Sequence, residues 1–477
     1  MIARAALAAL VATSLAGDVA HAQLREPKEE ALVAADGTSF LVTSGFVRVP
    51  ERRQAGGSDD AGVVDLAVVR VRPAGRAAGP THVVLAGGPG DSGVNLVLGL
   101  ARQGGAAIAE LMGGDVIGID QRGTGKSTPN LATPVLYELP PDRPGSPAAW
   151  LPIMEAVSRR VAAGFRARGI RLEAYNTRES ADDVEDVRRA FGAEKVTLWG
   201  RSYGSHLALA TIARHPARVE RAILVSPEGP DHTWKRPAIV DRVLATVAER
   251  AAMPDLVDRM REVIARLERE PATVDIPHPM TKQVVSVGVG AFDVQWLVAQ
   301  ALGDPRALAT LPAAVREMAA GRFTSIAQLA LIRRNRFGVE SAMKHMMDLS
   351  SGATAARRAL IEREAAASPL GNAINFPGMA LAAAWEAVDL GDGFRQALRS
   401  EVPVLILAGD LDPRTPIENA REIATTLPRA SVVVVENATH QFDLFGSPAM
   451  RSLLAGFLRD GIVATPQITL PPIVFAR

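Results

Sequence analysis

The chain has 477 residues, of which 48% are hydrophobic and 22% are charged, and its formal net charge is +1. This composition is ordinary for a globular protein with a sizeable core, and the near-neutral charge argues against electrostatic binding of nucleic acid. The chain has no cysteine, and none of its eight histidines is paired with another at metal-ligand spacing. We therefore expect no metal site, no cofactor and no disulfide.

The amino terminus has the pattern of a secretory signal peptide. A positive charge at Arg4 precedes an apolar stretch over residues 5–16, and Ala20-His21-Ala22 is a small-x-small cleavage site before Gln23. No other stretch reaches the roughly 18 apolar residues of a membrane span. We expect residues 1–22 to be removed after Ala22, which leaves a secreted or periplasmic protein that does not insert into the membrane.

Apolar strands alternate with helices in the first half of the chain. The predicted strands cover residues 46–50, 63–71, 82–86, 115–120, 196–199 and 222–225. Helical patterns cover residues 148–169 and 177–191, with Thr177 expected as the N-cap of the second helix. Continuous apolar strands that alternate with helices predict a mostly parallel sheet covered on both faces.

The pattern changes between residues 229 and 400, where helices dominate. These helices are predicted over residues 239–268 (broken at Pro254), 291–302, 310–320, 325–349 and 354–367, with one hairpin over residues 272–289. Alternation then resumes with strands at 402–408 and 431–436 and helices at 417–426 and 450–460. The sequence therefore predicts a doubly wound α/β sheet from residues 23–228 and 401–477, with residues 229–400 inserted as a helical lid between its sixth and seventh strands.

One short stretch has the pattern of a catalytic nucleophile. Gly200-Arg201-Ser202-Tyr203-Gly204 is a G-x-S-x-G sequence that follows an apolar strand and opens an apolar helix, which is the context of the α/β-hydrolase nucleophile elbow. We expect side chains at the two glycine positions to collide with neighbouring backbone in so tight a turn. The helix amino terminus behind Ser202 favours the negative charge that develops during acyl transfer.

The partners of a nucleophilic serine follow it in a fixed order in this fold, first an acid and then a histidine. After the seventh predicted strand the one remaining histidine is His440, in the loop that follows the eighth strand. Asp410 and Asp412 both follow the seventh strand, and we favour Asp412 because it lies further into the loop, whereas Asp410 is better placed to cap the loop. We therefore predict a triad of Ser202, Asp412 and His440.

The oxyanion hole of such an enzyme uses two backbone amides. One comes from the residue after the nucleophile, here Tyr203, and the other from the loop after an early strand, where Gly88 in Gly87-Gly88-Pro89-Gly90 is the candidate. Gly125-Lys126-Ser127 has the end of a P-loop, but Asp120 stands where the first glycine is required, so we exclude nucleotide binding.

These motifs together resemble the proline iminopeptidase and tripeptidyl aminopeptidase group of α/β-hydrolases. The resemblance covers residues 40–228 and 400–445, and its most specific part is a GGPG and DQRG pair. The matching sequences are Gly87-Gly88-Pro89-Gly90, Asp120-Gln121-Arg122-Gly123, Gly200-Arg201-Ser202-Tyr203-Gly204, Asp412-Pro413-Arg414-Thr415-Pro416 and the region of His440. The resemblance implies a secreted serine hydrolase that removes amino-terminal residues from peptides beneath its lid.

The chain departs from the family pattern in the region that selects the substrate. It has no cysteine in the late lid, and it reads Ser226-Pro227-Glu228-Gly229 where an Asp-Gly stretch is usual. An aminopeptidase needs a carboxylate to hold the substrate ammonium group, and Glu228 is the best placed candidate. Other candidates are Glu340, Glu386, Asp389 and Asp392.

Two alternatives stay open beside an aminopeptidase. A carboxylesterase would use the same triad and oxyanion hole under an apolar lid pocket, so the substrate would be an ester in place of a small peptide. A catalytically inactive hydrolase fold kept as a binding protein is the alternative of another class, and the intact set of Ser202, Asp412 and His440 argues against it.

Overall fold

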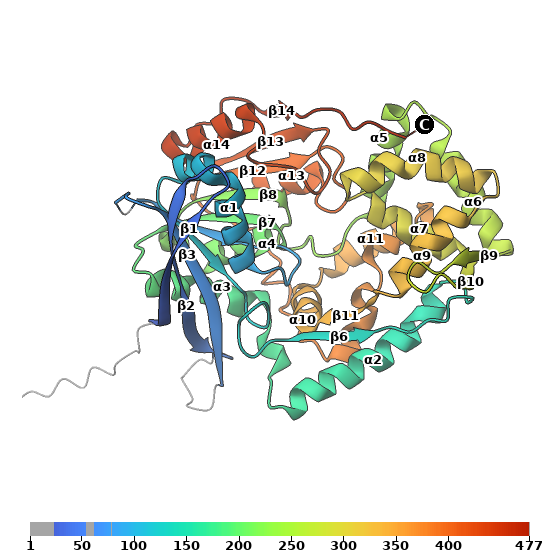
Figure 1. Ribbon diagram of the computed structural model, residues 1–477, viewed down its shortest axis with the longest axis horizontal. Helices are drawn as coiled ribbons and strands as arrows, with labels where there is room; N and C mark the ends of the chain where they lie inside the picture. Colours follow the sequence, from blue (N-terminus) through green and yellow to red (C-terminus); the bar gives the residue numbers. More distant parts are fainter. Residues whose placement is uncertain (1–22, 54–61, 78, 477) are drawn as a thin grey trace, which may run out of the picture.

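A ten-stranded sheet forms the left-hand and upper part of the molecule in Figure 1. The computed structural model describes residues 23–53, 62–77 and 79–476, so the predicted signal peptide lies outside the described residues. In spatial order the strands are β1 (Leu24–Val33), β2 (Ser39–Pro50), β3 (Val63–Pro73), β5 (Asp115–Ile119), β4 (Thr81–Leu85), β7 (Val196–Ser202), β8 (Val219–Pro227), β12 (Val404–Gly409), β13 (Ala430–Glu436) and β14 (Gln467–Thr469). Strands β1, β2, β3 and β5 pair antiparallel, and from β5 to β14 every pairing is parallel. The predicted α/β-hydrolase sheet is confirmed.

The central parallel strands are buried on both faces because their alternate residues enter two different cores. In β12, Val404 and Ile406 belong to one hydrophobic cluster, whereas Leu405 and Leu407 belong to the other. Helices α3 (Thr177–Ala190), α4 (Tyr203–Arg214) and α13 (Ile417–Ala424) contribute to the first cluster. Helices α1 (Gly93–Met112) and α14 (Pro448–Asp460) contribute to the second. The period of two along a strand therefore explains why these runs are apolar throughout.

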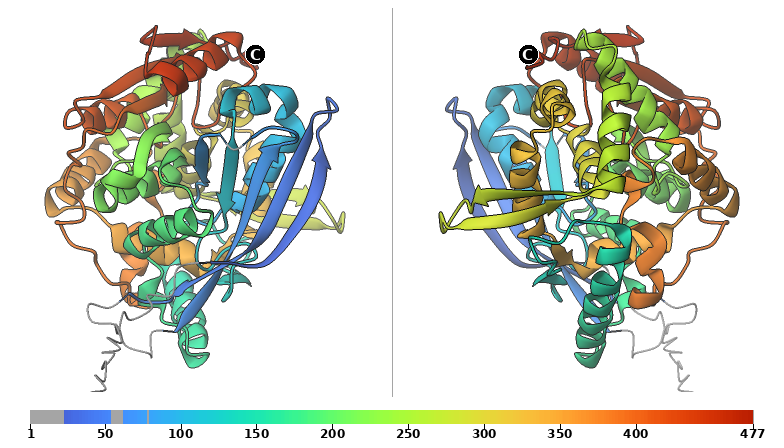
Figure 2. Two further views of the ribbon diagram at one scale, coloured as in Figure 1. Left: turned by 90° about the vertical axis from the view of Figure 1, so that its left-hand side faces the viewer. Right: turned by 90° about the vertical axis from the view of Figure 1, so that its right-hand side faces the viewer.

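The right-hand part of the molecule in Figure 1, which we call the helical lobe, is built mainly from helices inserted between β8 and β12. Its hairpin β9 (Ala272–Pro277) and β10 (Val284–Val289) was predicted from the sequence and projects at one side in Figure 2. The helices are α5 (Pro237–Arg250), α6 (Leu256–Arg269), α7 (Ala291–Ala301), α8 (Pro305–Ala319), α9 (Thr324–Arg334), α10 (Ala342–Ser351), α11 (Ala355–Ala367) and α12 (Ala382–Trp385).

An earlier stretch of chain also belongs to this lobe. Strand β6 (Ala132–Leu136) pairs antiparallel with β11 (Gly338–Ser341), and α2 (Pro147–Ala167) packs against α12. A buried arginine joins the two stretches, since Arg334 pairs with Asp293 at 2.9 Å and also donates to the carbonyl oxygen of Pro141 at 2.7 Å. The helical lobe is therefore connected to the sheet through two separate stretches of chain.

Several observed elements differ from the prediction, and α1, β6 and β14 were not predicted. The sequence pattern missed β1, whose side chains are mostly exposed, so the insertion follows the seventh strand of the sheet in chain order and not the sixth. The helix predicted over residues 325–349 is wrong, because β11 separates α9 from α10. The N-cap of α3 is Asn176, whose side chain accepts from the amide of Glu179, and Thr177 is the first helical residue.

Within the part of the chain that the structure describes, no helix is long and apolar enough to cross a membrane.

Candidate active site

Ser202 lies at a sharp turn between β7 and α4. Its backbone has φ 54° and ψ −125°, in the left-handed half of conformational space that side chains other than glycine rarely occupy. A Cβ atom at Gly200 would lie 2.4 Å from the carbonyl oxygen of Gly204, and one at Gly204 would lie 2.1 Å from that of Leu85. Both glycines are therefore required by the close approach of backbone, as the sequence predicted.

The three residues of the predicted triad come together at the carboxyl edge of the sheet. His440 Nε2 lies 3.1 Å from Ser202 Oγ, and His440 Nδ1 lies 2.9 Å from Asp412 Oδ2. Asp412 follows β12 and His440 follows β13, so the parallel register of the sheet places both loops beside the end of β7. The chain of two hydrogen bonds is the geometry in which a histidine removes the proton of a serine hydroxyl.

Asp412 is fully buried and is held by its own loop. Its Oδ1 accepts from the amides of Arg414 (2.8 Å) and Thr415 (3.0 Å), and its Oδ2 accepts from the Thr415 hydroxyl at 2.6 Å. Burial alone would raise the pKa of this carboxyl, but His440 and the Thr415 donors outweigh burial and hold the pKa below its usual range. Asp412 is therefore ionised and fixed in the direction of His440.

The other candidate acid is turned away from the triad. Asp410 forms an ion pair with Arg250 of α5, and its Oδ1 is buried without a hydrogen-bond partner among the described residues. The loop that contains His440 is anchored to β8, because the Ser226 hydroxyl donates to the carbonyl oxygen of His440 at 3.0 Å. Because Asp410 is paired with Arg250, it is Asp412 and not Asp410 that bonds His440 in the structure.

The glycine-rich turn after β4 lies against the nucleophile. A Cβ atom at Gly87 would lie 3.0 Å from the Arg201 carbonyl oxygen and 3.4 Å from Ser202 Cβ. Gly88 has φ +107°, which favours glycine, and it lines the same pocket as Ser202. The amide of Tyr203 stands at the first residue of α4, directly after Ser202. The structure therefore places both predicted oxyanion residues beside the nucleophile.

The DQRG sequence after β5 holds this turn in place. The buried Asp120 carboxylate accepts from the Ser92 hydroxyl at 2.5 Å and from the amide of Val94 at 3.1 Å, at the start of α1. Gln121 donates to the carbonyl oxygen of Ala86 at 3.3 Å. Arg122 is fully buried and makes two 2.7 Å bonds to the carboxylate of Asp183. These residues position the loops beside Ser202.

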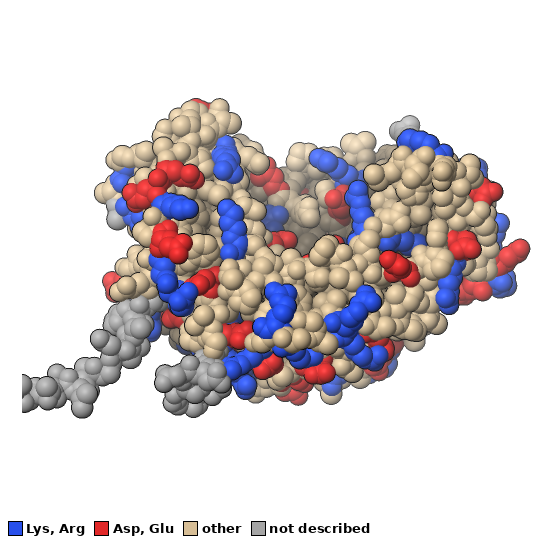
Figure 3. All heavy atoms as spheres, turned by 60° about the horizontal axis from the view of Figure 1, so that its bottom comes forward, with Lys and Arg blue, Asp and Glu red and all other residues tan. Residues whose placement is uncertain are grey.

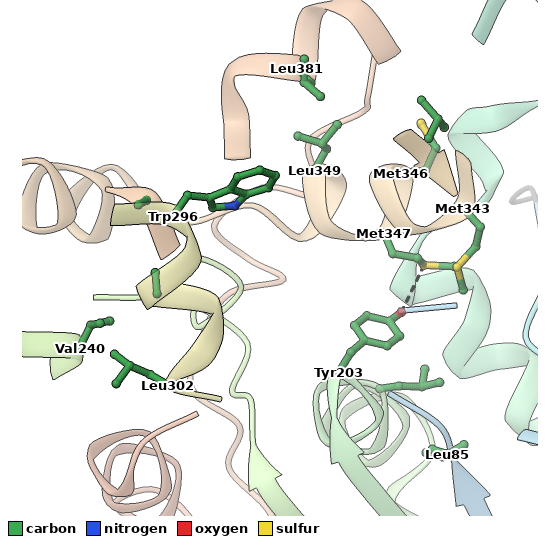
Figure 4. Packing of buried hydrophobic residues seen from close by; sticks show 14 of the residues in the cluster. Leu85, Tyr203, Val240, Trp296, Leu302, Met343, Met346, Met347, Leu349 and Leu381 are labelled. Carbon is green, nitrogen blue, oxygen red and sulfur yellow. Dashed lines mark hydrogen bonds between the residues drawn. The ribbon is translucent and has the colours of Figure 1, made fainter. Parts of the chain in front are cut away.

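A buried polar network joins the nucleophile helix to the helical lobe. The Tyr203 hydroxyl lies 3.0 Å from Thr177 Oγ1 and donates to Met347 Sδ at 3.2 Å, as Figure 4 shows for the methionine. Ser351, also on α10, lies 3.1 Å from Thr177 Oγ1 and 3.2 Å from Nε2 of His206. Helix α10 is therefore fixed against the elbow through its polar groups as well as through its buried methionines.

A pocket of about 1130 Å³ opens above Ser202 and His440. Its walls come from the loops of the sheet edge and from α7, α9 and α10 of the helical lobe. In the space-filling view a hollow lies between the two parts of the molecule, with both basic and acidic side chains at its rim (Figure 3). This volume is large enough for a small peptide or ester.

Glu228, the predicted amine ligand, lines this pocket with its carboxylate already paired. Lys235 Nζ lies 2.6 Å from Glu228 Oε2, and on α10 Lys344 Nζ lies 2.9 Å from Asp348 Oδ2. Burial alone would raise the pKa of Glu228, but the charge of Lys235 lowers it. For Asp348, burial and the nearby charge of Glu228 raise the pKa. The pocket thus contains two neighbouring carboxylates and a lysine for each.

The other predicted amine ligands are less well placed. Glu340 lines the pocket and is exposed. Glu386 pairs with Arg166 at 3.3 Å, and Asp389 and Asp392 lie beside a common arginine. None of these last three carboxylates lines the pocket.

The sequence did not single out four polar residues of the site: Thr415, Lys235, Lys344 and Asp348. The Asp-x-x-Thr spacing of Asp412 and Thr415 was a usable signal, because a hydroxyl three residues after an aspartate can bond its carboxylate. The lysines and Asp348 gave no such signal, since their approach to Ser202 depends on the packing of the lobe. In the described ranges no group of three or more acidic or histidine side chains could hold a metal ion.

Comparison with known proteins gives matches to two families, in two parts of the chain. Residues 81–283 match the alpha/beta hydrolase fold family, and residues 378–469 match the TAP-like protein family. Tripeptidyl aminopeptidases of Streptomyces lividans and Streptomyces coelicolor are each 29% identical over 155 residues, which is 31% of this chain. The matched stretch spans 29% and 28% of the length of those relatives. Among solved structures, an esterase from Exiguobacterium antarcticum aligns over 91% of this chain and 100% of its own, with 16% identity and a TM-score of 0.35.

Proposed function

This chain belongs to the TAP-like family of α/β-hydrolases, and from that premise we propose that it is an exported serine hydrolase that releases amino-terminal residues or short peptides from peptide substrates. The observation that carries the proposal is the hydrogen-bonded chain from Ser202 Oγ through His440 to Asp412, at 3.1 and 2.9 Å. Export rests on the sequence pattern of residues 1–22.

The reaction proceeds in two steps through an acyl-enzyme. Ser202 Oγ attacks the substrate carbonyl carbon while His440 Nε2 takes the hydroxyl proton, and the amides of Tyr203 and Gly88 stabilise the oxyanion. His440 then gives the proton to the leaving amine as the carbon–nitrogen bond breaks. A water molecule, deprotonated by His440, then attacks the acyl carbon; the bond from that carbon to Ser202 Oγ breaks, His440 returns the proton to Oγ, and the carboxylic acid product leaves. Asp412 stays ionised throughout and stabilises the imidazolium form of His440.

Two features support an aminopeptidase. The TAP-like match and the tripeptidyl aminopeptidase relatives are one. The other is the presence of two carboxylates, Glu228 and Asp348, in the pocket that contains Ser202, because an ammonium group in a partly dry site needs a negative partner. We assign Glu228 as the first ligand of the substrate amine, with Asp348 beside it.

One observation favours the alternative of a carboxylesterase. Lys235 and Lys344 already neutralise Glu228 and Asp348, so an incoming ammonium group must displace a lysine or share its carboxylate. An uncharged ester would meet no such competition.

A comparison of two matched substrates tests the proposal. Peptide anilides with a free and an acetylated amino terminus are offered to the wild type and to Ser202→Ala. We expect the wild type to cleave only the free peptide and Ser202→Ala to lose about 10⁴- to 10⁶-fold in turnover. Equal cleavage of both anilides, or turnover of simple esters alone, would contradict the aminopeptidase proposal and leave the esterase.

Labelling with a fluorophosphonate probe distinguishes an active serine hydrolase, whether aminopeptidase or carboxylesterase, from an inactive fold. The wild type should label at Ser202 and Ser202→Ala should not, whereas Ser325→Ala, which removes an exposed hydroxyl on α9, should label normally. A wild type that fails to label would support the inactive binding protein.

A further inference from the structure

Two arginines on the pocket wall differ from the two pocket lysines in having no acidic partner. Arg333, near the end of α9, and Arg414, two residues after Asp412, both line the pocket that contains Ser202. Among the residues that the structure describes, neither guanidinium lies within 4.0 Å of a carboxylate, whereas Lys235 and Lys344 each form a close ion pair. The two kinds of cation in one pocket are therefore held in different ways.

Aromatic rings hold the guanidinium of Arg333. It lies 4.8 Å from the centre of the Trp296 ring and 5.7 Å from that of Phe337. Its Nε is buried and has no hydrogen-bond partner among the described residues. Burial lowers the pKa of Arg333, and the charge of Arg414 lowers it further, against the opposing effect of Glu340. The guanidinium is thus oriented by flat apolar surfaces that leave its donors unused.

Helix α7 and Gly303, two residues beyond its end, hold Arg414. Its Nη2 donates to Gln300 Oε1 at 2.8 Å, and Gln300 stands one helical turn after Trp296 on the same face of α7. A Cβ atom at Gly303 would lie 2.6 Å from Nε of Arg414, so the absence of a side chain there makes room for the guanidinium. Trp296 and Gln300 therefore bring the two arginines to one wall.

Two neighbouring guanidinium groups without counter-ions are unfavourable in a partly buried site. Burial lowers the pKa of both arginines, and the charge of Arg414 lowers that of Arg333 further. Glu340 and Asp412 act in the opposite direction on Arg333 and Arg414, yet no carboxylate among the described residues lies within 4.0 Å of either guanidinium. A planar guanidinium presents paired N–H donors that match the two oxygens of a carboxylate. A ligand carboxylate between them would offset the repulsion and use the free donors.

We propose that Arg333 and Arg414 form a subsite for a carboxylate group of the substrate, supplied by the carboxyl terminus of a short peptide or by an acidic side chain. The subsite rests on the proposed function, because it belongs to the same pocket as Ser202. It makes the enzyme selective for short or acidic peptides over neutral, extended ones.

Binding to the inactive variant Ser202→Ala tests the subsite without turnover. Trialanine, trialanine amide and the amide of an alanyl-alanyl-glutamate peptide are titrated calorimetrically into this variant, alone and combined with Arg333→Gln or Arg414→Gln. Arg322→Gln is the matched control, because Arg322 is an exposed arginine of the same lobe that does not line the pocket.

We expect a carboxylate-bearing probe to bind about tenfold more tightly than trialanine amide at low salt, with a smaller ratio at high salt. A preference for trialanine identifies the carboxyl terminus as the source, and a preference for the glutamate peptide identifies the side chain. Arg333→Gln and Arg414→Gln should each reduce the ratio below about twofold and leave the binding of trialanine amide unchanged. Arg333→Lys should restore part of the preference for the carboxylate, because the positive charge is kept. The restoration should be incomplete, because the planar donor pair is lost.

Two results would overturn the subsite: equal binding of all three probes, or a preference for the acid that survives both arginine substitutions. Labelling by the neutral fluorophosphonate keeps this failure distinct from that of the proposed function. Normal labelling with no carboxylate preference rejects only the subsite. A carboxylate preference in a chain that does not label rejects only the serine hydrolase.

Discussion

The two sides of the pocket differ in how completely the protein satisfies its own charged groups. At the sheet edge, Asp412 accepts three hydrogen bonds from its own loop in addition to the one with His440. Toward the helical lobe, the guanidinium groups of Arg333 and of Arg414, which reaches α7 from the loop of Asp412, have no carboxylate within 4.0 Å among the described residues. The proposed catalytic acid is thus fixed in advance, whereas the two arginines of the proposed carboxylate subsite have donors free to meet a ligand.

The largest effect should come from a methyl group at the sheet edge. In Gly204→Ala the new Cβ would lie 2.1 Å from the carbonyl oxygen of Leu85, a distance that only a backbone shift can relieve. We expect the free energy of unfolding to fall by roughly 4 kcal/mol or more, with loss of labelling at Ser202. Chemical denaturation and the fluorophosphonate probe measure the two effects.

Gly164→Ala is the matched control for that substitution. Gly164 lies in α2, and an alanine Cβ there would have no heavy atom from elsewhere in the described chain within 4 Å. Alanine should therefore stabilise the protein by about 0.5–1 kcal/mol. Similar free energies of unfolding for the two variants would contradict the view that the turn at Ser202 has no room for a side chain at residue 204.

The buried side chain of His82, on β4, extends the comparison to pH. His82 Nδ1 accepts from the indole N–H of Trp199 at 3.1 Å, and Nε2 lies 2.9 Å from the carbonyl oxygen of Met112, so the ring is neutral with its proton on Nε2. Burial lowers the pKa of His82 to about 4, although the bond to Met112 acts in the opposite direction. A second proton on the ring would lie on Nδ1, where its N–H would face the indole N–H of Trp199 and the hydrogen bond between them would be lost.

The expected result is a loss of stability in acid. The unfolded chain binds this proton near pH 6.5 and the folded chain near pH 4, so the free energy of unfolding falls as the pH decreases between these values. The total loss from this group is about 3 kcal/mol. Denaturation curves from pH 7 to pH 4.5 measure it, and the slope should be smaller in Trp199→Phe, which removes the indole donor. An unchanged slope in that variant would exclude the Trp199 contact as a cause.

Removing the Thr415 hydroxyl should have a moderate effect on catalysis. Thr415→Val keeps the shape of the side chain but loses the 2.6 Å donor to Asp412. Since a hydrogen bond to a charged group contributes about 1.5–3 kcal/mol, we expect kcat/KM to fall about ten- to hundredfold, mainly through kcat. Thr415→Ser should retain most of the activity. A change in KM alone would show that Thr415 acts on substrate binding and not on the triad.

The smallest effect should come from the wall with the unpaired arginines. In Gly303→Ala the Cβ would lie 2.6 Å from the flexible side chain of Arg414, which can move away at little cost to stability. We expect unchanged labelling of Ser202 and a roughly two- to fivefold weaker preference for trialanine over its amide. A loss of stability comparable with that of Gly204→Ala would show that both sides of the pocket are equally rigid.

The sequence predicted the residues at the sheet edge because local rules determine them. The two glycines around Ser202, the order of acid and histidine, and the ends of parallel strands all follow from short patterns and from one sheet topology. Asp412 and His440, the two residues that these rules select, lie within hydrogen-bond distance of each other in the structure.

The helical lobe was less predictable, for physical reasons. Strand β11 lies within a run of helical periodicity, and its partner β6 is about 200 residues earlier, so no local pattern indicates the pairing. Strand β1 alternates too weakly to be recognised, because nearly all of its side chains are exposed. The direction of Arg414 depends on Gly303 and Gln300, which approach it only through tertiary packing.

The pairing of β6 with β11 has a consequence for how substrate reaches Ser202. Because β6 and α2 belong to the helical lobe, the chain passes between sheet and lobe at both ends of that stretch as well as at the two ends of the insertion, so a swing of the lobe about one hinge must bend all four connections. We expect the mouth of the pocket to keep one width throughout the catalytic cycle. Such an enzyme would act as a sieve, admitting slim, flexible chain ends and excluding folded proteins before any side chain is recognised.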